Sequence, residues 1–131
     1  MKKLALIIMS LCMLTACQKS IEERAEEEAR AYTEKYCPTP VYNNTRTDSL
    51  IFTRADRTFI YYCSLTGALD SLEIINQFRS DLHDGLLKSI RESTQLKLYK
   101  DAGFNFRYII RSEKSPETVL FESTFKPEEY N

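Results

Sequence analysis

The sequence predicts an α+β fold, a two-layer sandwich in which helices cover one face of a four-stranded antiparallel sheet. Helical periodicity in two separate segments and two pairs of strand-like segments joined by short polar turns predict it. The elements follow the order α-β-β-α-β-β, which suits hairpins with helices packed on one face. Such a sheet needs cover on that face only, so its other face is expected to contact solvent.

The first predicted helix begins after Ser20, with Glu23 three residues later as in a capping box. Apolar residues then recur at steps of three and four as far as Tyr36. Acidic residues fill its first half and basic residues lie towards its end, which complements the helix dipole. Two prolines break the helix near Cys37.

Two strands are predicted next, Asp48 to Arg54 and Thr58 to Leu65, with a short polar connector that favours a hairpin. In the second strand alternate residues from Phe59 to Leu65 share one face. Cys63 belongs to that set, so we expect it among core residues.

A second helix is predicted after an N-cap at Asp70, with an apolar stripe that runs from Leu72 to Ile90. A break is expected near Ser93. Residues 95–102 then form a further helical turn or two that ends at Gly103 as a C-cap.

Two more strands complete the predicted fold, the second of them Val119 to Phe125. In the first, Phe104 and the alternate residues after it point towards the core, and Arg107, Ile109 and Arg111 point the other way. These three form a candidate binding surface for an anionic or aromatic ligand or a partner protein. The alternative is an ordinary solvated sheet face.

The N-terminus has the pattern of a secretory signal: two lysines precede an apolar run from Leu4 to Leu14. That run is shorter than the roughly 20 residues that span a bilayer. The tetrapeptide Leu14-Thr15-Ala16-Cys17 behind it resembles the lipobox of bacterial lipoproteins. The resemblance implies a signal peptide over residues 1–16 and a single mature domain over residues 17–131.

In that family the cysteine is lipidated and becomes the first residue of the mature protein, so Cys17 would attach the chain to the lipid bilayer. Two or more acyl chains make such attachment stable. Gln18, in place of an aspartate, favours the outer membrane of a Gram-negative cell envelope. The alternative is an ordinary secretory signal with Cys17 an incidental thiol.

Two cysteines remain after processing and lipidation, Cys37 and Cys63. An even pair in an oxidising compartment predicts a disulfide. The structural alternative is two buried free thiols, and the functional alternative is a redox or metal site. A metal site is disfavoured because the sequence has no CxxC and a single histidine.

Few residues carry catalytic chemistry. His83 follows Leu82 on the second helix but lies about 100° round from the core stripe, so it should border solvent. Phosphate-binding loops and dinucleotide motifs are absent from the sequence. Removal of Lys2 and Lys3 leaves 16 basic and 19 acidic residues, which gives no electrostatic case for nucleic acid. We therefore expect neither an enzyme nor a cofactor.

Two function classes remain. The first is a non-enzymatic envelope module that binds another envelope protein or an extracellular polymer. The second is a small-ligand carrier with a cavity between helices and sheet. An apolar cavity of roughly 300 Å³ or more with a few inward polar groups would favour the carrier, and an exposed apolar patch over a filled core would favour the module.

Overall fold

The structure is a computed structural model that describes residues 19–131. The predicted presequence and Cys17 lie outside these residues. The predicted order of helices and strands is confirmed: α2 (Ile21–Tyr36), β1 (Thr45–Thr53), β2 (Thr58–Leu65), α3 (Leu72–Glu92), β3 (Asn105–Ser112) and β4 (Val119–Phe125). Short helical segments add η1 (Gly67–Leu69), α4 (Lys97–Asp101) and α5 (Pro127–Tyr130).

The sheet is mixed, and the prediction of a purely antiparallel sheet is wrong. Its strand order is β1-β2-β3-β4, with antiparallel pairs at both edges and a parallel pair, β2 and β3, in the centre. The reason is the connection: α3 and α4 carry the chain back along the sheet, so Asn105 starts β3 beside Thr58 at the start of β2. Long helical crossovers of this kind join parallel strands.

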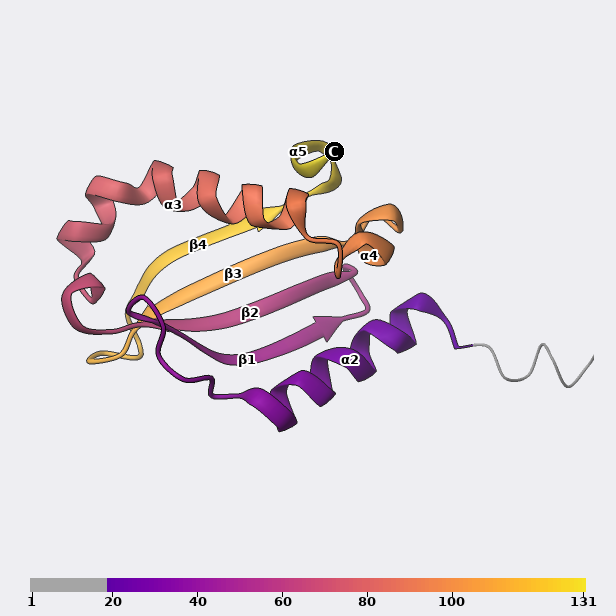
Figure 1. Ribbon diagram of the computed structural model, residues 1–131, viewed down its shortest axis with the longest axis horizontal. Coiled ribbons are helices and arrows are strands. Elements are labelled where there is room, and N and C mark those ends of the chain that lie inside the picture. Colours follow the sequence, from indigo (N-terminus) through magenta and orange to yellow (C-terminus); the bar gives the residue numbers. More distant parts are fainter. Residues whose placement is uncertain (1–18) are drawn as a thin grey trace, which may run out of the picture.

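Both long helices cover the same face of the sheet, α2 over β1 and α3 over β4 (Figure 1). Ala25 and Ala29 are almost fully buried under α2, and their small side chains let the helix lie close to the sheet. Thr33 fastens this packing, since its hydroxyl donates to the Leu50 carbonyl at 2.7 Å and accepts from the Leu50 N–H at 2.9 Å.

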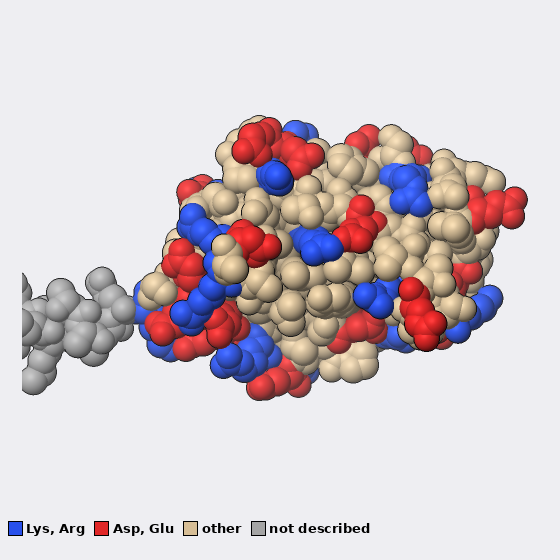
Figure 2. All heavy atoms as spheres, turned by 180° about the vertical axis from the view of Figure 1, so that it is seen from behind, with Lys and Arg blue, Asp and Glu red and all other residues tan. Residues whose placement is uncertain are grey.

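The opposite face of the sheet has no helix over it among residues 19–131. Figure 2 shows this face with charges of both signs spread among uncharged residues, including one oppositely charged pair near its middle. No helix in the described part of the chain is long and apolar enough to cross a bilayer.

The helix caps agree with the sequence in one case and differ in the other. Ser20 accepts from the Glu23 N–H at 3.1 Å, as predicted. The second long helix is capped by Ser71, not Asp70, through the Ile74 N–H at 3.4 Å. Asp70 instead accepts from the Lys114 N–H at 3.0 Å, so its carboxylate holds the β3–β4 loop against the start of α3.

The core consists of two clusters. The first is mostly aromatic and lies towards α4 and α5, with Phe104, Phe106 and Phe125 fully buried. The second is mostly aliphatic and includes Ile75 and Ile110. Tyr61 and Tyr108 pack against both clusters, so they lie at the junction between them.

Candidate functional site: a groove between two helices

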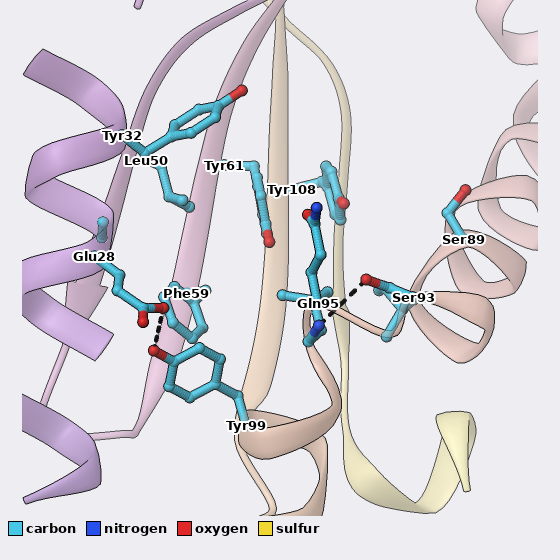
Figure 3. A pocket seen from close by; sticks show the side chains of 13 residues that line it. Glu28, Tyr32, Leu50, Phe59, Tyr61, Ser89, Ser93, Gln95, Tyr99 and Tyr108 are labelled. Atoms are coloured by element: carbon cyan, nitrogen blue, oxygen red, sulfur yellow. Dashed lines mark hydrogen bonds between the residues drawn. The ribbon is translucent and has the colours of Figure 1, made fainter. Parts of the chain in front are cut away.

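A groove of about 400 Å³ runs between α2 and α3, with the sheet as its floor (Figure 3). It exists because α2 lies over one edge strand and α3 over the other, which leaves the middle of the sheet without a helix. The residues that line it are Glu28, Ala29, Tyr32, Leu50, Phe59, Tyr61, Ser89, Ile90, Ser93, Gln95, Leu96, Tyr99 and Tyr108. The groove is partly open to solvent.

Two stacked tyrosines form the centre of the floor. Tyr61 and Tyr108 are register partners in the parallel pair, and their rings lie 4.5 Å apart between centroids at an interplanar angle of 8°. Burial raises the pKa of both phenols above the ordinary value of 10.0, so both stay neutral donors. Neither hydroxyl has a hydrogen-bond partner in the part of the chain that the structure describes.

Polar groups line the rims of the groove. On the α2 side the Tyr99 hydroxyl donates to Glu28, which also accepts from Arg24 Nε at 3.1 Å. Burial first, and the bond to Glu28 second, raise the pKa of Tyr99. On the opposite side the exposed Gln95 side chain lies in front of the Tyr108 ring (Figure 3).

The chemistry of this lining suits binding. Apolar walls and a tyrosine floor bury apolar surface, and free hydroxyls accept or donate single hydrogen bonds. The lining contains no histidine, cysteine or lysine. Within residues 19–131 no cluster of three metal-ligating side chains is found.

His83 lies outside the groove. It is half-buried at the α3–β4 edge, where its Nδ1 is 3.2 Å from an Asp84 carboxylate oxygen and its ring packs 5.0 Å from Phe125. This agrees with the expectation that the imidazole borders solvent.

The candidate surface of Arg107, Ile109 and Arg111 lies on the outer sheet face, away from the groove, as the alternation predicted. The expectation that this face contacts solvent is wrong at Ile109, because only 7% of this residue is exposed. In register it sits between Tyr62 and Glu122.

The two arginines of that surface are held by their neighbours. Arg107 forms an ion pair with Glu122, including a contact from Nε at 3.0 Å. Arg111 donates to the Pro116 carbonyl at 3.3 Å, and its Nε is buried without a partner among the described residues. A binding role for this surface stays a prediction.

The predicted disulfide is not found: Cys37 and Cys63 are both free thiols. Edge strand β1 explains this, because Thr47 pairs with Cys63 on one side and with Thr39, in the segment after Cys37, on the other. Burial raises the pKa of the Cys63 thiol to about 11 and also raises that of Cys37.

A cavity between helices and sheet was one of the two expectations from the sequence, but its residues were not predicted. Tyr61 and Tyr108 lie on its floor and stack as core residues would. The available signal was their chemistry, since a tyrosine on a core face needs a partner for its hydroxyl. Nothing in the local pattern reveals that the two helices leave these residues uncovered.

The fold is similar to that of solved structures that include two type II secretion pilotins. The pilotin EpsS of the Vibrio vulnificus type 2 secretion system is similar, with a TM-score of 0.66, 13% identity and coverage of 84% of this chain and 91% of that one. The type II secretion pilotin AspS of Vibrio cholerae is also similar, with a TM-score of 0.57, 12% identity and coverage of 82% and 90%.

A predicted secreted protein from Pseudomonas aeruginosa shares the fold as well, with a TM-score of 0.70, 12% identity and coverage of 87% of this chain and all of that one. At sequence level the chain belongs to the family described as Domain of unknown function (DUF8479), which matches residues 20–121. No curated protein matches the sequence.

Proposed function

We propose that this protein is a lipid-anchored, non-enzymatic envelope module that binds a helical segment of another envelope protein in the groove between α2 and α3. The observation that carries the proposal is the uncovered floor, where the Tyr61 and Tyr108 rings are open to the groove and their hydroxyls have no partner within residues 19–131. Neither hydroxyl is a fully buried unpaired atom, so both are free to bond to solvent or to an occupant of the groove. An occupant that covers the rings would bury their apolar surface and would replace solvent as the partner of these hydroxyls.

The shape of the groove favours a helix as the occupant. Its two walls are the helices α2 and α3, and a third helix between them would complete the helical layer over the sheet. Amphipathic helices bind apolar grooves in this way, through residues spaced by three and four. A small-ligand carrier is the second candidate function, since the groove's volume of about 400 Å³ and its few polar lining groups fit a ligand cavity.

Two further observations support an envelope location. The Leu14-Thr15-Ala16-Cys17 motif resembles a lipobox, and lipid on Cys17 would hold the domain at a membrane. The structural neighbours include pilotins of type II secretion systems. Attachment to the outer membrane, with a protein partner there, is part of the same proposal.

Site-specific photocrosslinking in the native cell envelope tests the proposal. A photoreactive phenylalanine would replace Tyr32 in the groove, and in a matched variant it would replace Tyr62 on the outer sheet face. Both tyrosines are half-buried, so the two replacements disturb the fold to a similar degree. We expect a discrete adduct with one envelope protein from position 32 and none from position 62.

The opposite result would contradict the groove as the binding site. An adduct from position 62 alone would make the outer face, with Arg107 and Arg111, the binding surface. If neither position gives an adduct while the chain is membrane-bound, the proposed protein partner is excluded at both faces.

A further inference from the structure

One end of the molecule is built from the start of α2, the β1–β2 turn and α4 (Figure 1). Side chains of the turn fasten these parts together. Arg57 pairs with Glu22 at 3.3 Å and donates to the Ala102 carbonyl at 2.9 Å, and Arg54 pairs with Glu26 at 2.5 Å. This end, called the α4 end below, is therefore a fixed surface.

The α4 end is also where the chain arrives from Cys17. The cap at Ser20 fixes the first turn of α2, so only three residues separate Cys17 from Ile21. A fully extended chain covers about 3.5 Å per residue, which limits this distance to about 14 Å. The opposite end, at the β3–β4 loop, lies farther by the length of β2, about 23 Å.

The charges of the α4 end are mostly paired with one another. Lys19 pairs with Glu27 at 2.8 Å, and Lys97 pairs with Asp101 at 2.8 Å, in addition to the pairs of the β1–β2 turn. A neutralised surface neither strongly attracts nor strongly repels anionic lipid headgroups. The tether, rather than charge, would then decide which end of the domain is near a bilayer.

We infer that the α4 end is the membrane-facing surface of the domain, held against the lipid headgroups by the three-residue tether. The inference rests on the lipid anchor of the proposed function. It gives the groove a direction: the part lined by Glu28, Gln95 and Tyr99 lies nearest the bilayer, and the part lined by Tyr32 lies farther out. The occupant is thus a segment that reaches close to the membrane surface.

Tryptophan quenching tests the inference, because the chain contains no tryptophan of its own. The full lipidated chain would be reconstituted in phosphatidylcholine vesicles that carry a nitroxide on the headgroup. Ala55→Trp places the probe in the exposed β1–β2 turn, and Glu117→Trp places it in the exposed β3–β4 loop. We expect several-fold stronger quenching of Ala55→Trp than of Glu117→Trp, with the same ratio when anionic phosphatidylglycerol is added.

Equal quenching at the two positions, or stronger quenching of Glu117→Trp, would overturn the inference. A variant with a 20-residue Gly-Ser insert between Gln18 and Lys19 checks the cause, since such a linker has a root-mean-square length of about 25 Å. The insert should abolish the difference between the probes, and a ratio that survives it would overturn the tether as the cause. Flotation with the vesicles is measured first: a chain that does not float contradicts the lipid anchor itself, which separates failure of the proposed function from failure of this inference.

Discussion

Single hydroxyl groups on the groove floor give the first test at the residue scale. Tyr61→Phe and Tyr108→Phe keep the stacked rings and remove only the oxygen. Stability should change little, because neither hydroxyl has a partner within the described residues. Binding of the partner should weaken by about 0.5–1.5 kcal/mol where a hydrogen bond is lost, or roughly two- to tenfold in Kd.

The partner identified by crosslinking would be titrated against both variants, with thermal unfolding as the stability measurement. Tyr62→Phe, on the outer face, is the matched control and should leave binding unchanged. Unchanged affinity in both groove variants would mean that the occupant makes no bond to the floor hydroxyls.

Buried phenols and a buried thiol make the fold sensitive to alkali. Burial raises the folded-state pKa of Tyr61 and Tyr108 above 10.0, and that of Cys63 from 9.0 to about 11. The unfolded chain therefore releases these protons at a lower pH than the folded chain does. The free energy of unfolding should be unaffected by these groups below pH 9 and should fall as the pH rises through 9 to 11.

Urea unfolding across that pH range measures the effect, and Tyr61→Phe should reduce the slope of stability against pH. A wild-type slope of zero would indicate that water reaches these groups freely in the folded state.

Ile109 is a buried residue on the outer sheet face, and its neighbour Arg107 is partly exposed, so truncation of the two should have different effects on stability. Ile109→Ala should cost about 2 kcal/mol or more, since the side chain is 7% exposed and its truncation leaves a cavity. Arg107→Ala removes a partly exposed ion pair and should cost about 1 kcal/mol or less. Chemical denaturation of both variants gives the comparison, and equal costs would show that the outer face is not packed around Ile109.

At the scale of elements, the sequence predicted most of the helices and strands because each carries its own period. The Ser20 cap and the alternation from Phe104 to Arg111 are local signals, and the structure has both. Strand β1 was predicted to start at Asp48 but starts at Thr45. Asp48 is a poor strand residue, and it lies where the register between Thr47 and Ser49 is interrupted.

Replacement of two glycines by alanine should have opposite effects on the stability of the protein. Gly85 lies inside α3, and a Cβ there would meet no atom within 4 Å. Gly85→Ala should therefore stabilise the protein by about 0.5–1 kcal/mol. Gly103 has φ of +78° after α4, so Gly103→Ala should destabilise it.

Differential scanning calorimetry of the two variants should show Tm rising for Gly85→Ala and falling for Gly103→Ala. A fall in both would mean that α3 needs the flexibility of Gly85.

At the scale of the whole molecule, the sequence could not predict what depends on how elements are placed. Strand direction between β2 and β3 follows from the crossover, which local alternation does not encode. The absence of a bond between Cys37 and Cys63 follows from the position of β1 between them. The groove needs the separation of α2 from α3, to which no single segment contributes a signal.

Lipidation belongs to this scale as well. Cys17→Ser should abolish processing by the lipoprotein pathway and should release or mislocalise the chain, while the domain over the described residues keeps its fold. Membrane fractionation with mass spectrometry of the N-terminus measures this. A cleaved, membrane-bound product of the serine variant would show that Cys17 is not the anchor.

The Thr33 hydroxyl of α2 bonds to the backbone at the free edge of β1, and this affects how copies of the protein interact when they are crowded on one membrane. Proteins tethered to one membrane collide often, and an unpaired strand edge invites neighbouring copies to join into continuous sheets. Thr33 occupies both backbone groups of Leu50, and Thr39 occupies those of Thr47. These contacts occupy part of the edge that a neighbouring copy would otherwise pair with, so Thr33→Val should leave the monomer folded yet more prone to aggregate when it is concentrated on vesicles.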